Sequence, residues 1–143
     1  MAAAVRIRTF EMRDYEQVVA LWRAAGLSLS LSDDEPGIEH RLQRDAELFI
    51  VAESGGRAVG AVMGCYDGRR GWVNHLAVAP GQQRNGIGTM LMAELEARFR
   101  ALGCVKVNLL ISPGNGGVQP FYDAIGYTRD DLIFMEKVLR PAD

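Results

Sequence analysis

The sequence predicts an α/β fold of one domain, in which helices flank both faces of a central mixed β-sheet. Three observations predict it: a length of 143 residues, helical and strand periodicities that alternate along the chain, and tight turns that give way to one long helical connection. A chain of this length forms one domain with a self-sufficient core. Apolar residues make up 48% and charged residues 24%, as in folded proteins. We therefore expect a single domain over residues 1–143.

In the first part of the chain, two helices follow an opening strand. Residues 5–10 alternate apolar and polar side chains, which is the period of a strand with one buried face. Apolar residues at helical spacing follow Asp14, which can cap a helix, and Gly26 is placed to end that helix. A loop over 27–34 leads to a second helix over about 35–45, whose start carries an Asp cap and a first-turn proline.

Short apolar segments of strand length then alternate with tight turns. Residues 47–53 and 57–66 predict an antiparallel hairpin, because Ser54-Gly55-Gly56 between them is a typical tight turn. A third strand is expected over 72–79, and Pro80-Gly81 ends it.

The last part of the chain contains the one long helical pattern. An amphipathic helix is expected over about 86–102, followed by a strand over 104–111 whose near-continuous apolar run predicts a buried central position. A loop over 112–117 and a short helix over 118–125 come next, and Tyr127–Val138 predicts one or two further strands. Hairpins combined with one crossover helix imply a mixed sheet.

Composition excludes several classes of protein. The formal net charge is −2, so no general field attracts nucleic acid or an anionic membrane surface. Cys65 and Cys104 are the only cysteines, which excludes a disulfide scaffold and a structural zinc site. Neither a signal-peptide core nor an apolar segment of membrane-spanning length occurs. We expect a cytoplasmic protein without a metal, and a homodimer is left open.

Glycine is in excess, and its distribution draws attention to one segment. The chain has 16 glycines, about 11% where about 7% is usual, and most fall at turns and helix ends. Residues 76–89, LAVAPGQQRNGIGT, combine a strand end, a glycine-containing turn and the start of the long helix. Free N–H groups at a helix N-terminus bind phosphate. Gly86 and Gly88 allow close approach of the backbone, and Arg84 can add a charge-assisted contact.

Two common phosphate-binding motifs do not fit this segment. A P-loop needs Lys and then Ser or Thr after its last glycine, but Ile87 follows Gly86. A dinucleotide-binding fingerprint needs a glycine or alanine three residues after Gly88, where Leu91 stands. What remains is Gln83-x-x-Gly86-x-Gly88 directly after a strand.

That arrangement resembles the GNAT superfamily of acetyl-CoA-dependent N-acetyltransferases. The strand HLAVAP (75–80), the turn QQRNGIG (82–88) and the long helix are similar to its cofactor-binding motif. The later segment NGGVQPFYDAIGY (115–127) resembles its second signature, and VMGCYDGRRG (62–71) looks most like the small bacterial YpeA-like members. The resemblance covers essentially the whole chain and implies the GNAT fold.

The resemblance implies roles for the matching positions. Backbone N–H groups of Arg84 to Thr89 would hold the pyrophosphate of coenzyme A, and the backbone of Leu76 to Val78 would pair with its pantetheine arm. Asn115 would bond that arm, and Tyr122 would protonate the leaving thiolate, a role that suits a phenol. The implied cofactor-binding residues are Leu76, Ala77, Val78, Gln83, Arg84, Asn85, Gly86, Ile87, Gly88, Thr89, Asn115 and Tyr122.

The general base stays unassigned. Many family members place Glu or His on the strand before the cofactor turn, but strand alternation puts Trp72 and Asn74 on the relevant face here. Alternation directs His75 to the other face, so a structural or substrate-orienting role is favoured for it. Proton loss through water past Asn74 is the other hypothesis, which makes Asn74 a candidate catalytic residue beside Tyr122.

Two further features depart from the family pattern or have two interpretations. Gly116-Gly117 and Pro120 lengthen the loop around Asn115. This departure affects the implied contact between Asn115 and the pantetheine arm more than the implied role of Tyr122. The acidic residues at 33–35, with Glu39 and His40 one helical turn further on, fit either a rim that selects a cationic amine or ordinary helix capping, and capping is favoured.

We therefore expect an N-acetyltransferase that transfers acetyl from acetyl-CoA to a primary amine by direct attack in a ternary complex. Neither cysteine lies in a motif that would activate it as a nucleophile. The expected partners are acetyl-CoA and an amine acceptor, either a small molecule or a protein amine. An acyl-CoA-binding sensor or interaction module without turnover is the alternative.

Overall fold

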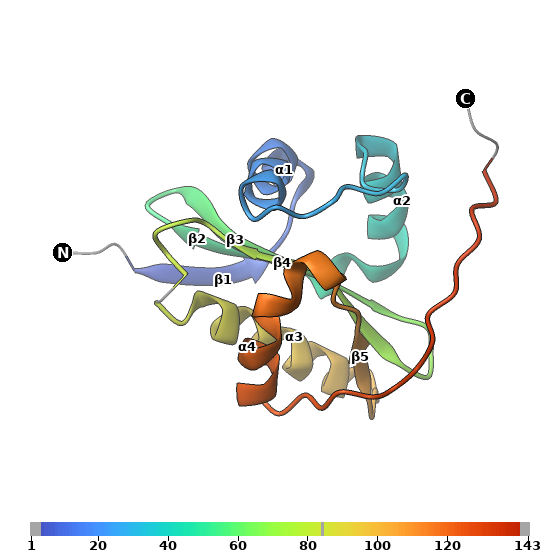
Figure 1. Ribbon diagram of the computed structural model, residues 1–143. Helices are drawn as coiled ribbons and strands as arrows, with labels where there is room; N and C mark the ends of the chain where they lie inside the picture. The colour runs from blue at the N-terminus through green and yellow to red at the C-terminus, as the bar shows by residue number, and fades with distance from the viewer. Residues whose placement is uncertain (1–3, 84, 141–143) are drawn as a thin grey trace. The chain divides into compact units, whose positions relative to one another are not determined.

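A computed structural model describes residues 4–83 and 85–140 (Figure 1). It divides into two units, Met1–Leu110 and Ile111–Asp143, which are described separately. The first unit contains β1 (Val5–Thr9), η1 (Met12–Asp14), α1 (Tyr15–Ala24), α2 (Glu35–Asp45), η2 (Ala46–Leu48), β2 (Phe49–Ser54), β3 (Arg57–Tyr66), β4 (Gly71–Val78), α3 (Ile87–Ala101) and β5 (Val107–Leu109). The second contains η3 (Pro113–Val118) and α4 (Gln119–Ala124).

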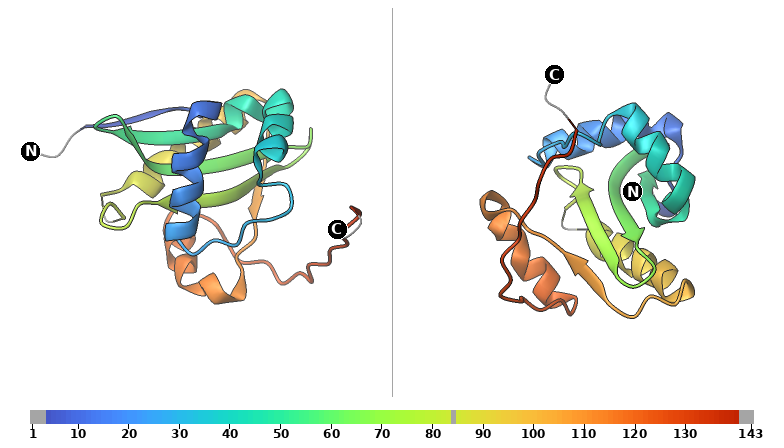
Figure 2. Two further views of the ribbon diagram at one scale, coloured as in Figure 1. Left: turned by 90° about the horizontal axis from the view of Figure 1, so that it is seen from above. Right: turned by 90° about the vertical axis from the view of Figure 1, so that its right-hand side faces the viewer.

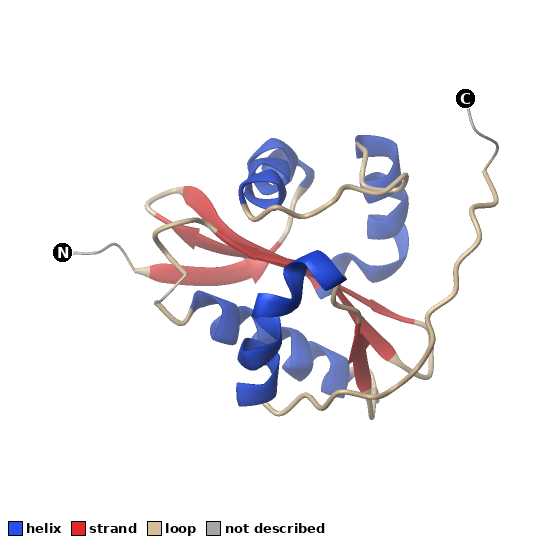
Figure 3. Ribbon diagram, viewed as in Figure 1, coloured by secondary structure: helices blue, strands red, loops and turns tan. Residues whose placement is uncertain are grey.

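The strands form one mixed sheet in the order β1-β2-β3-β4-β5 (Figure 3). The pairs β1–β2, β2–β3 and β3–β4 are antiparallel, whereas the pair β4–β5 is parallel. The hairpin between β2 and β3 turns at Gly55 and Gly56, whose φ angles of +59° and +77° suit a tight turn that matches the strand twist. The predicted mixed sheet is confirmed.

Helices cover both faces of this sheet. α1 and α2 lie on one face and α3 lies on the other (Figure 1, Figure 2). On the α1 face, a core cluster of buried side chains comprises Phe10, Val18, Val19, Leu21, Trp22, Ile38, Phe49, Val51, Ala61, Met63 and Ala77. α3 buries Ile87, Leu91, Leu95 and Phe99 of the apolar row expected on one face of the long helix, but Leu102, the last residue of that row, is exposed. The amphipathic patterns of the sequence therefore identified these buried faces correctly.

Glycines within the strands let α3 approach the sheet closely. A Cβ at Gly60 would lie 2.9 Å from Ile87 Cγ2, and one at Gly64 would lie 2.6 Å from Leu95 Cδ1. Gly71, which directly precedes the strand expected over 72–79, is the first residue of β4, and a Cβ there would lie 2.9 Å from Phe99 Cε1. Part of the glycine excess therefore serves helix–sheet packing and not turns.

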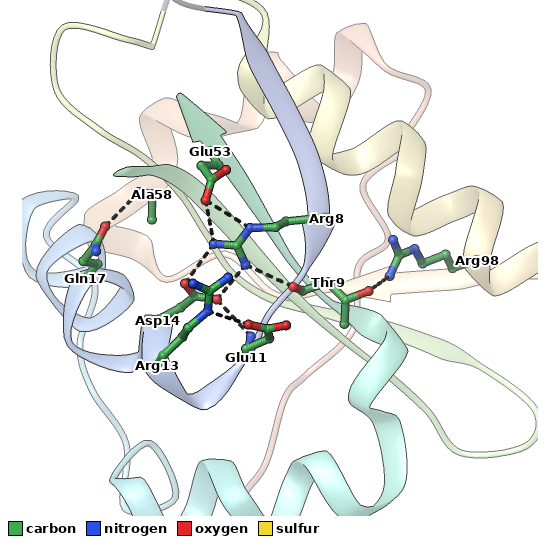
Figure 4. Close-up of polar contacts among 9 residues, drawn as sticks. All are labelled: Arg8, Thr9, Glu11, Arg13, Asp14, Gln17, Glu53, Ala58 and Arg98. Carbon is green, nitrogen blue, oxygen red and sulfur yellow. Dashed lines mark hydrogen bonds and ion pairs between the residues drawn. The ribbon is translucent and has the colours of Figure 1, made fainter. Parts of the chain in front are cut away.

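Arg8 joins β1, β2 and the start of α1 (Figure 4). Its guanidinium donates to both carboxylate oxygens of Asp14, at 2.8 and 2.9 Å, and to Glu53 Oε1. Asp14 occupies the predicted N-cap position of α1, but its side chain does not cap that helix. Its carboxylate instead accepts from Arg8 and from the N–H of Glu11, at 2.9 Å. The cluster therefore joins the edge strand β1 to β2 and to the start of α1.

Two strand predictions near the C-terminus are wrong. β5 has three residues, Val107–Leu109, where 104–111 was expected, and it is an edge strand with Val105 and Leu110 exposed beside it. Tyr127–Val138 forms neither strand nor helix, and exposes Leu132, Ile133, Phe134, Met135 and Val138. A strand forms only where a partner backbone runs beside it, and apolar content alone does not show that partner.

In the second unit, α4 begins one residue later than predicted, and Pro120 lies in its first turn. The expected loop before it is the 3-10 segment η3, interrupted by non-helical backbone at Asn115. Within the described ranges 4–83 and 85–140, no helix is long and apolar enough to cross a membrane.

Candidate functional site

The N-terminus of α3 is an anion-attracting end of a 15-residue helix. Gly86 is the N-cap residue and has φ +75°, a conformation that glycine adopts without strain. The first bond of the helix runs from Met90 N–H to Gly86 O, so the N–H groups of Ile87, Gly88 and Thr89 have no carbonyl acceptor within the helix. No acidic residue occupies the first turn, and the helix dipole adds positive potential there.

Side chains of the turn before α3 stabilise the turn itself. Gln83 Nε2 donates to Val78 O at 3.3 Å, and Asn85 Nδ2 donates to Gln82 Oε1 at 3.0 Å. Arg84, a predicted phosphate ligand, lies outside the described residues. Ile87 and Gly88 are buried, whereas Asn85, Gly86 and Thr89 are exposed. A ligand at this end would therefore meet backbone N–H groups, and Gln83 and Asn85 would keep them in place.

The edge of β4 that faces β5 is open over most of its length. β5 pairs with β4 only at Gly71, Trp72 and Val73. Within the part of the chain that the structure describes, no strand continues this pairing along Asn74–Val78. The predicted residues Leu76, Ala77 and Val78 therefore lie on a free strand edge, which can pair with an extended ligand.

β4 contains a bulge at His75. Ala61 of β3 pairs with Ala77, but Met63 pairs with Asn74, so the single residue Val62 lies opposite both His75 and Leu76. Among the described non-glycine residues, His75 is the only one with a positive φ, +50°. A bulge changes the alternation of side chains along a strand.

The bulge overturns the predicted orientation of His75. Its ring lies against Trp22 of α1, with ring centroids 5.0 Å apart, and so faces α1. Asn74 pairs with Met63, which belongs to the same core cluster as Trp22. Both residues therefore belong to the α1 face of β4, because directly paired residues share a face. Strict alternation had placed them on opposite faces, and no periodic signal in the sequence marks such a bulge.

His75 forms an ion-pair geometry with Asp33 that sequence reasoning missed. The distance from His75 Nε2 to Asp33 Oδ2 is 2.8 Å. The same oxygen accepts from Ser30 N–H at 2.7 Å and from Ser30 Oγ at 3.0 Å. The carbonyl of Asp33 accepts from the Tyr15 hydroxyl at 3.0 Å. These contacts join β4 to the loop between α1 and α2 across 42 residues of sequence, a separation at which no local pattern operates.

Asp33 is a buried acidic residue, and only 6% of it is exposed. Burial alone would raise the pKa of its carboxyl, but hydrogen bonds from His75 and from the backbone and side chain of Ser30 outweigh it and lower the pKa. Asp33 is therefore a carboxylate at neutral pH with its charge directed to His75.

Two of the acidic residues at 33–35 have local partners. Asp34 caps α2, since its Oδ1 accepts from Gly37 N–H at 2.9 Å, and this confirms the capping interpretation for that residue. Asp33 is buried against His75.

In the second unit, Tyr122 of α4 is buried and makes edge-to-face contacts with Phe121 and Tyr127. Burial raises the pKa of Tyr122 to about 12, so the phenol is protonated at neutral pH. Asn115 is exposed, and its N–H donates to Ser112 O at 2.8 Å.

A cavity of about 420 Å³ adjoins the turn between β4 and α3 in the first unit. It lies between α1, the β2–β3 hairpin and the segment after β4, and it is lined by Gln17, Leu21, Arg57, Val59, Pro80 and Gln82 among others. None of the described residues predicted for the site lines it.

Comparison with known proteins shows the family. The model of the acetyltransferase (GNAT) family matches residues 7–127. An acetyltransferase of Yersinia enterocolitica is 38% identical over 135 residues, which are 94% of this chain and 96% of that protein.

Solved structures share the fold. Ard1 from Thermoplasma volcanium superposes with a TM-score of 0.76 and 26% identity, over 90% of this chain and 85% of that one. The PaiA N-acetyltransferase of Thermoplasma acidophilum, in complex with coenzyme A, has a TM-score of 0.79 at 17% identity, over 91% and 93% of the two chains. The chain therefore belongs to the GNAT family of acetyltransferases and is an acetyl-CoA-dependent N-acetyltransferase.

Proposed function

We propose that this protein transfers the acetyl group of acetyl-CoA to a primary amine by direct attack in a ternary complex. The observation that carries the proposal is the open edge of β4 over Asn74–Val78, which leads through one turn to the uncapped N-terminus of α3. An extended arm with hydrogen-bonding amides and a pyrophosphate at one end fits that combination.

The backbone holds the coenzyme in this proposal. Leu76, Ala77 and Val78 pair with the pantetheine arm as another strand would, and the N–H groups of residues 84–89 bind the pyrophosphate. An N–H near Val78 polarises the thioester carbonyl and stabilises the negative charge that develops on its oxygen. Backbone donors suit this task because Gln83 and Asn85 already stabilise the turn.

Tyr122 assists departure of the sulfur, and Asn115 binds the pantetheine arm. A phenol with a pKa of about 12 does not fully give its proton to a thiolate, whose usual pKa is about 8.5. Tyr122 therefore stabilises the leaving sulfur mainly as a hydrogen-bond donor while the carbon–sulfur bond breaks.

The state of Cys65 supports direct attack without an acetyl-cysteine intermediate. Burial raises the pKa of the Cys65 thiol above its ordinary value, although Arg41 beside it acts in the opposite direction. The thiol is therefore protonated and a poor nucleophile at neutral pH. Cys104, in the segment between α3 and β5, is buried and forms no disulfide.

Coenzyme A binding to a Gly86→Ala variant tests the phosphate site. A Cβ at this left-handed N-cap stands where a phosphate would approach the free N–H groups, so the Kd should rise about tenfold or more, measured by calorimetry. Gly26→Ala is the matched control, because Gly26 has φ +76° against +75° for Gly86 and a Cβ at either position meets nothing within 4 Å. Both variants should lose about 1 kcal/mol of stability.

The two variants and a turnover assay separate the outcomes. Affinity reduced only in Gly86→Ala supports the proposed site, and equal affinity in both variants contradicts it. Release of free thiol from acetyl-CoA, measured with a panel of small amines and N-terminal peptides, tests transfer itself. Coenzyme A binding without release on any acceptor would support the sensor hypothesis instead.

A further inference from the structure

We propose that His75 is the base that removes a proton from the acceptor amine, and that Asp33 is the positioning residue that orients it. This inference rests on the proposed function, because it assigns the proton-accepting group of that same reaction. Four observations on the first unit carry it.

The hydrogen bonds of Asp33 determine which nitrogen of His75 can accept a proton. A carboxylate only accepts hydrogen bonds, so the ring nitrogen that meets Asp33 Oδ2 at 2.8 Å, Nε2, carries hydrogen. In the neutral ring, Nδ1 then has a free lone pair. Within the described residues no partner of Nδ1 is found. The pair therefore presents one basic nitrogen in a defined tautomer.

The carboxylate of Asp33 is itself held in place. Its Oδ2 accepts two bonds from Ser30, and the backbone carbonyl of Asp33 accepts from Tyr15 on α1. The side chain of Asp33 is 7% exposed, so its charge is little screened by solvent. A buried, ionised carboxylate stabilises the imidazolium that forms when Nδ1 takes a proton.

The backbone of His75 lies in an unfavourable region for a residue with a side chain. A φ of +50° in a strand persists only where the surroundings hold it, and such residues cluster at sites with a function. The bulge lies where β4 leaves its partner β5, at the beginning of the open edge Asn74–Val78. The strained residue and the proposed thioester site are therefore on the same stretch of strand.

The His75 ring is both supported and accessible. Trp22, which is fully buried, supports the ring from α1. The side chain of His75 is nevertheless 20% exposed. The ring can therefore be reached from solvent beside the open strand edge.

The proton and bond changes balance. His75 Nδ1 takes one proton from the ammonium form of the acceptor, and the neutral nitrogen attacks the thioester carbon. The nitrogen–carbon bond forms and the carbon–sulfur bond breaks. The attacking nitrogen loses one further proton as it becomes an amide, and the leaving thiolate takes up one proton to become free coenzyme A. These two changes cancel. The imidazolium then returns its proton to solvent, so one proton is released in each turnover.

Two acceptors of different basicity test this assignment. A lysine-like alkylamine is an ammonium ion at neutral pH and needs a base, whereas hydroxylamine is neutral there and does not. We compare kcat for both acceptors in His75→Asn and Asp33→Asn, with acetyl-CoA as donor. Asn is chosen at position 75 because it tolerates positive φ better than most residues do. His40→Gln is the matched control, since His40 is the other histidine and is exposed on α2. Asp34→Asn controls for Asp33→Asn and keeps a capping oxygen.

The expected result is selective loss. His75→Asn lowers kcat for the alkylamine about 100-fold or more and leaves kcat for hydroxylamine within a few-fold, with coenzyme A affinity and thermal unfolding close to wild type. Asp33→Asn shows a smaller loss with the same selectivity, and both controls keep wild-type ratios. Equal loss for both acceptors, or no loss, overturns the assignment while the transfer activity of the wild type stands. A wild type that acetylates neither acceptor overturns the proposed function itself.

Discussion

At the scale of single residues, the structure shows that two aspartates in the first part of the chain bind basic side chains of the sheet. Asp14 and Asp33 both stand where an aspartate would cap a helix or begin one, yet each carboxylate is used elsewhere. Arg8 binds the first, and His75 binds the second. Local pattern predicted the positions of the helix starts well, but it did not predict these partners, which lie on β1 and β4.

The Asp14–Arg8 pair predicts how stability depends on pH. Burial alone would raise the pKa of the Asp14 carboxyl, but hydrogen bonds from Arg8 and from the Glu11 N–H outweigh it and lower the pKa. Below the usual Asp pKa of about 3.9, the unfolded chain therefore binds a proton that the folded chain does not. The stabilisation is complete above about pH 5 and is lost as the pH falls through the lowered pKa of the folded state.

Asp14→Asn should therefore reduce the free energy of unfolding by about 2 kcal/mol at neutral pH and flatten its decline in acid. Urea unfolding at a series of pH values measures both effects. Asp123→Asn, at an exposed position on α4, is the control. An acid decline as steep in Asp14→Asn as in the wild type would show that Asp14 is not the group responsible.

At the scale of elements, helix–sheet packing explains glycines that sequence reasoning had assigned to turns or left unexplained. α3 lies on β3 and β4 at positions 60, 64 and 71, where any side chain would meet its buried row. The helix itself was predicted within one residue at each end, because a long amphipathic pattern is a strong signal. The small residues opposite it carry no periodic signal, so only the packed structure shows their purpose.

Gly64→Ala should destabilise the fold by about 1–3 kcal/mol, because its Cβ would lie 2.6 Å from Leu95 Cδ1 and 2.9 Å from Phe99 Cζ. Thermal unfolding measures the effect. Gly114→Ala is the control, since a Cβ there meets nothing within 4 Å. If the two variants lowered Tm equally, α3 would not approach β3 as closely as the structure shows.

At the scale of the whole molecule, the chain consists of a sheet unit and a C-terminal unit of different character. The family match spans residues 7–127 and so includes α4 with Tyr122. Beyond it, residues 128–140 have no helix or strand and expose a run of large apolar side chains: Leu132, Ile133, Phe134, Met135, Val138 and Leu139. The apolar run led to the prediction of a strand, but a strand also needs a hydrogen-bonding partner.

Hydrogen exchange on the full chain checks this segment. Peptides covering 132–139 should exchange rapidly, because their amides take part in no helix or sheet ladder, whereas β2 and β3 should be protected. Mass spectrometry at several exchange times gives the comparison within one experiment. Strong protection over 132–139 would show that these residues do pair as a strand, in contradiction to the structure.

The sequence by itself determined the fold class, the order of elements up to α4, and the turn and helix start that identify the family. These features depend on periodicity, caps and glycine positions, which are local properties of the chain. The tertiary structure alone decided the bulge at His75, its bond to Asp33, the short pairing of β5 and the unpaired end of the chain. Each of these depends on which distant backbone lies alongside, and hydrogen-bond register between distant segments has no signature in a single stretch of sequence.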